Sequence, residues 1–113
     1  MYMAKKIKLV DFKGDAIYRG NILRVCGKYP YEEFVDFMFF EAKLTGSTYG
    51  LMVVSGYKAG LILVYLPNEC LAEDGGIDKA WLVKNWSNWI YPDCDVSDVY
   101  WIEMYNADAI VKA

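Results

Sequence analysis

Short apolar runs alternate with turn residues along most of the chain, a pattern that is typical of β-strands joined by tight loops. Runs rich in branched and aromatic residues occupy 7–12, 16–26, 32–44, 49–55 and 60–66. Turn-forming residues at 13–15 separate the first two runs, and a glycine-bounded turn at 56–60 separates the last two. Each of these two pairs of runs is therefore expected to form a hairpin.

The run 32–44 carries apolar side chains on both faces when it is drawn as a strand. One face has Val35, Phe37 and Phe39, and the other has Phe34, Met38 and Phe40. We therefore expect this strand to be covered on both sides. A helix is the alternative for this run, but its branched and aromatic composition favours a strand.

One helix is predicted near 78–90. Asp78 can cap its N-terminus by accepting a hydrogen bond from an unpaired backbone amide, and Pro92 marks its far limit. At 100° per residue, one apolar arc contains Leu82, Val83, Trp86, Trp89 and Ile90. Trp81 falls on the polar side and is expected to be the most exposed tryptophan, the alternative being that it caps the core from the helix edge.

A last strand is predicted at 99–105, with Val99, Trp101, Glu103 and Tyr105 on one face. The expected fold class is α+β and β-dominated, a curved antiparallel sheet of about six strands with one helix, in a single domain over 1–113. A sandwich or a half-open barrel would also fit this pattern.

Composition excludes several classes of protein. Hydrophobic residues make up 56% of the 113 positions, which is too many for a disordered chain. The chain has no histidine, which removes the Ser-His and Cys-His nucleophile schemes, so no catalysis and no cofactor are expected. No apolar run approaches the roughly 20 residues that span a bilayer, and the N-terminus lacks a signal-peptide pattern. The protein is therefore expected to be cytoplasmic. Three widely spaced cysteines, with no C-x-x-C pair, indicate reduced, mostly buried thiols.

Charge is divided unevenly along the chain. Residues 1–28 hold seven basic and two acidic side chains, a net charge of +5, while the remainder holds five basic and thirteen acidic ones, a net charge of −8. The N-terminal lysines are spread over two strand-like runs, which favours a solvated strand face over a nucleic-acid site. The acidic remainder would attract a basic protein, and nucleases are commonly basic because their substrates are polyanions.

The C-terminal half also carries a recognisable series of short motifs. They are G-Y-K-A-G-L-I-L-V-Y-L-P-N-E at 56–69, G-G at 75–76, W-L-V-K-N-W-S-N-W-I-Y at 81–91 and D-V-Y-W-I-E-M-Y at 98–105. This series resembles the small immunity proteins of bacterial polymorphic-toxin and contact-dependent growth inhibition systems. The resemblance implies a cytoplasmic protein that binds the toxic C-terminal domain of an effector, often a nuclease, and blocks its active site without catalysis.

Four tryptophans lie beside five carboxylates between 81 and 108, and no basic residue follows Lys84 in this range, a composition that suits a binding surface for a basic protein. The carboxylates would pair with the lysines or arginines that hold a phosphate in the toxin, and the aromatics would seal the contact from water. The residues expected to contact the toxin are Asp93, Asp95, Asp98, Trp101, Glu103 and Tyr105, with Trp81 and Glu69 as outer members.

Two other functions fit the same residues. A small-ligand or carbohydrate binder would use its tryptophans and tyrosines to line a cleft. A structural subunit would use an aromatic patch to form a homodimer, although a monomer or weak dimer is expected here. The aspartates at 93, 95 and 98 have a partial calcium-like spacing but lack the turn glycine and terminal glutamate, so no metal site is expected.

Overall fold

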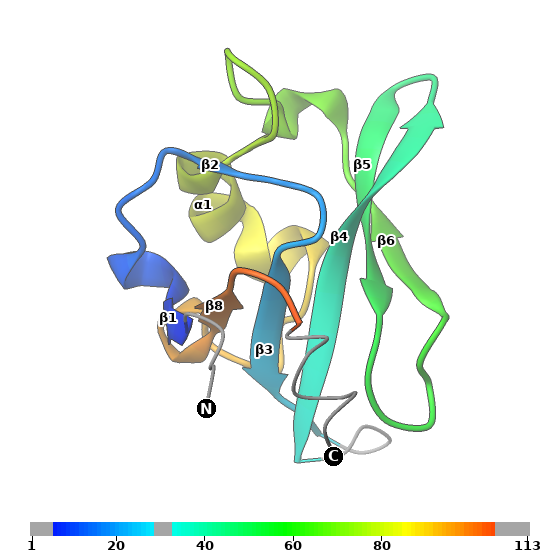
Figure 1. Ribbon diagram of the computed structural model, residues 1–113, viewed down its shortest axis with the longest axis vertical. Helices are drawn as coiled ribbons and strands as arrows, with labels where there is room; N and C mark the ends of the chain where they lie inside the picture. Colours follow the sequence, from blue (N-terminus) through cyan, green and yellow to red (C-terminus); the bar gives the residue numbers. More distant parts are fainter. Residues whose placement is uncertain (1–5, 29–32, 106–113) are drawn as a thin grey trace.

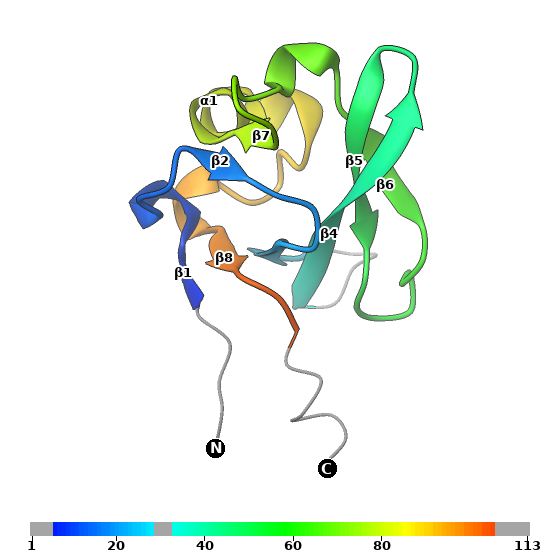
Figure 2. The same ribbon diagram turned by 45° about the horizontal axis from the view of Figure 1, so that its top comes forward.

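The computed structural model describes residues 6–28 and 33–105 (Figures 1 and 2). The strands in this part of the chain are β1 (Lys6–Lys8), β2 (Ala16–Ile17), β3 (Ile22–Cys26), β4 (Phe34–Leu44), β5 (Ser47–Val53), β6 (Ile62–Tyr65), β7 (Ile77–Asp78) and β8 (Tyr100–Ile102). The helices are α1 (Lys79–Trp89) and the 3-10 turns η1 (Leu9–Asp11), η2 (Asn68–Cys70) and η3 (Val96–Asp98). This content confirms the predicted α+β, β-dominated class with one α-helix.

Six strands form one antiparallel sheet in the order β1-β8-β3-β4-β5-β6, and β2 and β7 form a second, two-stranded sheet. The larger sheet is open, with β1 and β6 at its two edges, so it is not a barrel. The predicted hairpin at the 56–60 turn is confirmed, because β5 pairs with β6. The long strand β4 lies between β3 and β5 at the centre of the sheet.

The predicted hairpin across residues 13–15 is wrong. β1 pairs with β8 and β2 pairs with β7, so the two strands that flank this turn belong to different sheets. The chain leaves the sheet after β1 because Leu9 is fully buried and the ring of Phe12 stacks on Trp101, with ring centroids 4.3 Å apart. The turn signal was correct, but side-chain burial decided which elements it joins.

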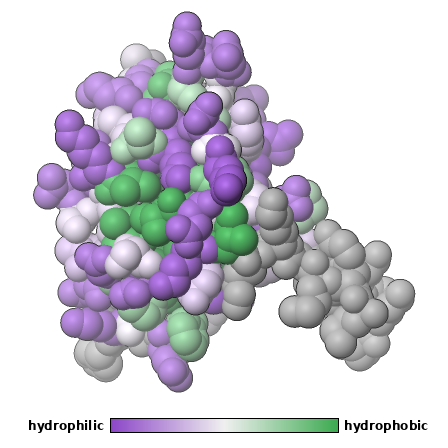
Figure 3. Space-filling model, turned by 90° about the vertical axis from the view of Figure 1, so that its left-hand side faces the viewer, coloured by the Kyte–Doolittle hydropathy of each residue, from purple (hydrophilic) through white to green (hydrophobic). Residues whose placement is uncertain are grey.

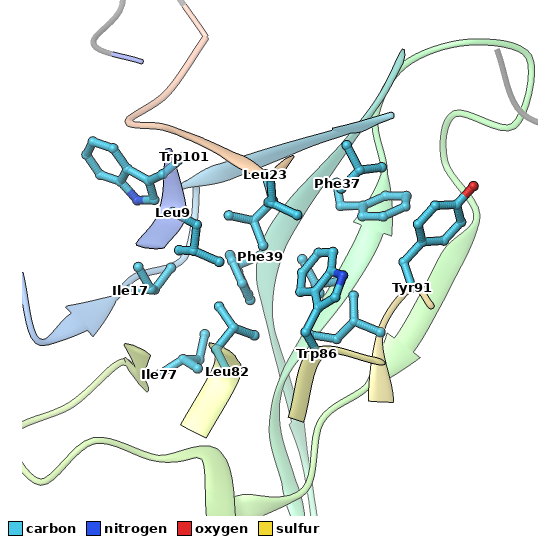
Figure 4. Packing of buried hydrophobic residues seen from close by; sticks show 14 of the residues in the cluster. Leu9, Ile17, Leu23, Phe37, Phe39, Ile77, Leu82, Trp86, Tyr91 and Trp101 are labelled. Carbon is cyan, nitrogen blue, oxygen red and sulfur yellow. The ribbon is translucent and has the colours of Figure 1, made fainter. Parts of the chain in front are cut away.

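The hydrophobic core lies between α1 and one face of the larger sheet. Leu82 and Trp86 of the helix point towards Phe37 and Phe39 of β4, as Figure 4 shows. Because side chains alternate along a strand, every second residue of β3, β4 and β5 enters this core. The fully buried members on these strands are Leu23, Val25, Val35, Phe37, Phe39 and Leu51.

The opposite face of the sheet, here called the outer face, is only partly covered. Phe34 is 56% exposed, whereas Met38 and Phe40 on the same face of β4 are half-buried. The expectation that both faces of this strand are covered is therefore wrong. The single α-helix of the described residues packs on the core face, which leaves the outer face without an equivalent layer.

Helix α1 begins where the sequence predicts. The Asp78 side chain accepts a hydrogen bond from the Trp81 amide at 3.2 Å, as an N-cap does. Trp81 is half-buried and packs against the core, whereas Trp89 is 43% exposed, so the predicted order of exposure is wrong. A helical wheel shows on which side of the axis a side chain lies, but it does not show whether neighbouring elements cover that side chain. Trp89 is the last residue of the helix, where this cover ends.

No helix within residues 6–28 and 33–105 has the length and apolarity needed to cross a membrane.

The last strand is shorter than predicted. β8 covers only Tyr100–Ile102, and Trp101 within it is 5% exposed. The prediction that Val99, Trp101, Glu103 and Tyr105 share one strand face is therefore wrong, because the first two residues are buried and the last two lie beyond the strand. Trp101 faces the core because it pairs with Leu23, a core residue of β3.

Candidate functional site

Three of the predicted site residues lie together in the segment between α1 and β8. Asp93, Asp95 and Asp98 are all exposed. The Asp95 carboxylate caps η3 by accepting hydrogen bonds from the hydroxyl and the amide of Ser97, which lower the pKa of Asp95. Asp98 lies 3.9 Å from the Lys8 Nζ. Lys8 pairs with only one of the three carboxylates, so the segment keeps a net negative charge.

The remaining predicted residues are distributed over other parts of the surface. Glu103 follows β8 whereas Asp98 precedes it, so the two residues lie at opposite ends of that strand. Glu69 lies on η2, near the top of the molecule in Figure 1, whereas β8 and its exit lie near the middle. The eight residues predicted to contact a partner therefore do not form one patch.

Tyr105 and Trp101 have contacts that a sequence pattern does not show. The Tyr105 hydroxyl donates a hydrogen bond to Asp36 Oδ2 at 3.0 Å across the outer face. The Trp101 ring stacks on the ring of Phe12. The Trp101 Nε1 has no hydrogen-bond partner among the described residues. Trp101 is only 5% exposed, so it offers little surface for contact with a partner.

An apolar hollow lies between η1 and the first turns of α1. Its volume is about 690 Å³, and its apolar lining consists of Val10, Phe12, Ala80 and Val83. Figure 3 views the side of the molecule that carries β1 and η1, and it shows an apolar area surrounded by polar side chains. Charged residues also line the hollow, namely Lys13, Asp15, Asp78, Lys79 and Lys84.

The position of the hollow is fixed by hydrogen bonds between η1 and α1. Lys79 Nζ donates to the carbonyl of Val10 at 3.2 Å and to the carbonyl of Phe12. The Lys79 ammonium group is thereby bonded to backbone carbonyls of the chain itself. η1 also packs against η3, and Leu9 N donates to Val99 O at 2.8 Å. The acidic turn with Asp98 therefore lies beside the apolar hollow.

An acidic pocket adjoins the apolar hollow on another side. It measures about 590 Å³, and four carboxylates line it: Asp15, Glu73, Asp74 and Asp78. Its lining contains no lysine or arginine, and none of the four carboxylates has an ion-pair partner among the described residues. Asp15 and Asp78 line both cavities, so the two form one continuous surface, here called the double hollow.

The topology explains why these carboxylates meet. β2 pairs with β7, which sets Ala16 opposite Asp78, and Lys79 N donates to Asp15 O at 3.0 Å. The turn before β7 needs left-handed backbone at Gly75 and Gly76, with φ of 106° and 78°. At Gly76 a Cβ would also lie 2.7 Å from the carbonyl of Ile17, so only glycine lets the turn pack this closely.

Sequence reasoning did not identify the double hollow. Adjacent acids at 73 and 74 are usual in a solvated turn, and Asp15 lies far from them in the chain. Only the pairing of β2 with β7 brings them together, and two-residue strands leave almost no periodic signal. The glycine pair beside the acids was the one local sign of a tight turn at this place.

Comparison with known families shows what kind of protein presents this surface. Residues 9–101 match the family model of Immunity protein 45. The chain belongs to this immunity protein family. The matched segment contains both cavities of the double hollow and η3, and it ends within β8. No curated protein and no solved structure matches the chain.

Membership confirms the resemblance to small bacterial immunity proteins. Such a protein binds a cognate toxin protein, so the surface to be found on this chain is one that recognises a protein. Protein interfaces combine an apolar centre with a polar rim, and the double hollow has both.

Proposed function

We propose that this Immunity protein 45 member acts in the cytoplasm and neutralises a nuclease toxin domain by docking the double hollow over the toxin's active site. The observation that carries this proposal is the junction of an apolar and an acidic cavity at Asp15 and Asp78. An inhibitor of a nuclease needs negative charge where the nucleic acid would bind and apolar area to exclude water. The double hollow offers both within one surface.

In this arrangement the acidic pocket receives a lysine or arginine side chain of the toxin. Glu73 and Asp74 are exposed and have no ion-pair partner in the described chain, so they can accept charge-assisted hydrogen bonds from a guanidinium group. Tyr18, which is 54% exposed, lines the same pocket and supplies an aromatic face for the cation. A nuclease uses such basic side chains to hold phosphate, so their capture would block substrate binding.

The apolar hollow provides the contact that excludes water. Val10 is 37% exposed and Val83 is half-buried, so both can lose further area to a partner. Apolar burial contributes about 25 cal/mol per Å² before the costs of association. An apolar side chain of the toxin that fills this hollow would exclude water from the neighbouring ion pairs. These ion pairs would then be stronger, because charges attract more strongly in a medium of low dielectric constant.

The acidic segment with Asp93, Asp95 and Asp98 has a supporting role in this proposal. Its η3 turn packs against η1 at the margin of the apolar hollow, so its charges add to the field that a basic partner meets first. Glu69 on η2 and Trp81 on α1 are assigned to the outer margin of the contact, whereas Glu103 and Tyr105, which follow β8, are given no part in it. Trp101 acts through Phe12.

The test is co-expression of this chain with the toxin domain encoded beside it. Survival of the host and recovery of a complex of the two proteins are the expected results. A toxin domain from an unrelated system, expressed with the same chain, is the control and should kill the host. Killing by the neighbouring toxin, with the immunity protein present and folded but no complex formed, would overturn the proposal.

A second function is favoured by the size of the apolar hollow. Its volume of about 690 Å³ lies in the range of small-molecule sites, roughly 300–1,000 Å³. A small-ligand or carbohydrate binder would show a change in tryptophan fluorescence when it is titrated with apolar or sugar ligands. An immunity protein alone would show none, so this titration separates the two functions.

A further inference from the structure

Two cysteines that are distant in the sequence lie in contact. Cys26 ends β3, Cys94 lies in the segment after α1, and their Sγ atoms are 2.9 Å apart although 68 positions separate them. Cys26 is exposed, whereas Cys94 is 1% exposed. A disulfide has an S–S distance near 2.05 Å, so the sulfur atoms need to approach by only about 1 Å.

The two segments are also held together by neighbouring hydrogen bonds. The Tyr91 hydroxyl accepts a hydrogen bond from the Lys28 amide at 3.0 Å, next to the end of β3. Trp86 Nε1 donates to the carbonyl of Cys94 at 2.8 Å and fixes the backbone at that residue. The two thiols therefore remain close because the structure around them is fixed.

We propose that Cys26 and Cys94 are a modification site at which a low-molecular-weight disulfide, such as glutathione disulfide, converts the two thiols into an intramolecular disulfide. This bond would tie the end of β3 to the acidic segment after α1. The proposal rests on the positions of the two sulfur atoms and does not depend on toxin binding.

The reaction proceeds in two exchange steps. First, the thiolate of exposed Cys26 attacks one sulfur of glutathione disulfide, which forms a mixed disulfide and releases one glutathione thiolate. Cys94 then loses its proton to solvent and attacks the Cys26 Sγ, which expels the second glutathione as thiolate. The two protein thiols lose two electrons and two protons, and one glutathione disulfide is reduced to two glutathione molecules.

Burial decides which cysteine reacts first. Loss of hydration raises the pKa of the Cys94 thiol to about 12 and that of Cys70 to about 11. Cys94 is therefore a weak nucleophile towards a reagent in solvent, and its attack depends on proximity to Cys26. Cys70 is 1% exposed in the core, which makes it a suitable cysteine to remove as a control.

The test uses the purified full-length chain, incubated with glutathione disulfide at about pH 8. The unfolded product should contain one free thiol instead of three, weigh about 2 Da less than the starting protein, and yield a peptide that joins residues 26 and 94. Cys70→Ala should form the same crosslink, whereas Cys26→Ser should not.

The crosslinked chain should also melt roughly 10 °C higher than the reduced chain, because the bond closes a long loop in the unfolded state. Addition of dithiothreitol should restore the original melting temperature. The proposal is overturned if folded Cys70→Ala protein keeps both thiols. A glutathione adduct on Cys26 that never resolves to the crosslink would also overturn it.

Discussion

Arg24 and Asp36 face each other on β3 and β4 and form a two-pronged ion pair on the outer face of the sheet. Arg24 Nε lies 2.8 Å from Asp36 Oδ1, and Nη2 lies 3.0 Å from Oδ2. Asp36 is only 4% exposed, and Tyr105 donates a further hydrogen bond to Oδ2. The carboxylate thus has three side-chain donors, and it links the segment after β8 to the centre of the sheet.

Replacement of Asp36 by alanine should lower the free energy of unfolding by about 2 kcal/mol, because it leaves a partly buried arginine without its partner. Glu41→Ala provides the matched control. It removes the carboxylate of another arginine pair, at 2.9 Å from Arg19, but Arg19 is 71% exposed. Its loss should be below about 1 kcal/mol. Equal losses in urea unfolding would contradict the role given to burial.

Ionisation of Tyr105 should lower the free energy of unfolding as the pH rises above about 10. Burial, followed by the neighbouring Asp36 carboxylate, raises the pKa of Tyr105 above its ordinary value. The folded chain therefore holds the phenol proton more tightly than the unfolded chain does, so this stabilisation is complete below about pH 10 and is lost above it. Tyr105→Phe should lose less stability than the parent as pH rises above 10, as measured by urea unfolding at each pH. Parallel losses in both proteins would exclude this contribution.

Gly50 lets the ring of Phe40 lie across β5. A Cβ at residue 50 would come within 2.8 Å of the Phe40 ring and 2.9 Å of the Val64 carbonyl. Gly50→Ala should therefore destabilise the chain by about 1–3 kcal/mol, since the strand must shift or the ring must turn. A double-mutant cycle with Phe40→Ala should recover part of this loss. Full additivity would show that the ring does not occupy the space above the glycine.

Trp86 and Trp101 allow one substitution to be compared in two surroundings. Both side chains are at most 5% exposed, but Trp86 Nε1 donates to Cys94 O whereas Trp101 Nε1 has no partner among the described residues. Trp86→Phe leaves a buried carbonyl without its donor and should cost about 1–2 kcal/mol more than Trp101→Phe. Equal changes in thermal unfolding would show that the hydrogen bond is not stabilising.

The sequence predicts elements well wherever the signal is local. The helix from 79 to 89 follows from its apolar arc and the cap at Asp78, and the hairpin of β5 and β6 follows from alternation around a glycine turn. Long, regular segments bury one face, so their pattern contains the information on their type. The membership in an immunity protein family was likewise indicated by motifs in the C-terminal half.

Tertiary contacts decide what the pattern could not. The short strand β1 pairs with β8 at the other end of the chain, because burial of Leu9 turns the chain away from its sequence neighbour. The acidic pocket depends on the pairing of β2 and β7, which is invisible in a two-residue strand. Exposure of a single side chain, such as Trp101, depends on which partner lies beneath it rather than on its own segment.

The most direct measurement of the docking surface is the association rate of the toxin domain with two charge-reversed variants. Glu73→Lys with Asp74→Lys alters the acidic pocket, and Asp93→Lys with Asp98→Lys alters the segment after α1. Each pair changes the net charge from −3 to +1, so the general electrostatic effect is matched.

Stopped-flow mixing at low and moderate salt would give both rates and their salt dependence. We expect the Glu73→Lys, Asp74→Lys variant to associate about 10-fold or more slowly and to dissociate faster, because direct contacts are lost. The Asp93→Lys, Asp98→Lys variant should show a smaller loss in association rate and a nearly unchanged dissociation rate. The reverse order would place the contact on the segment between α1 and β8 and contradict the assignment to the double hollow.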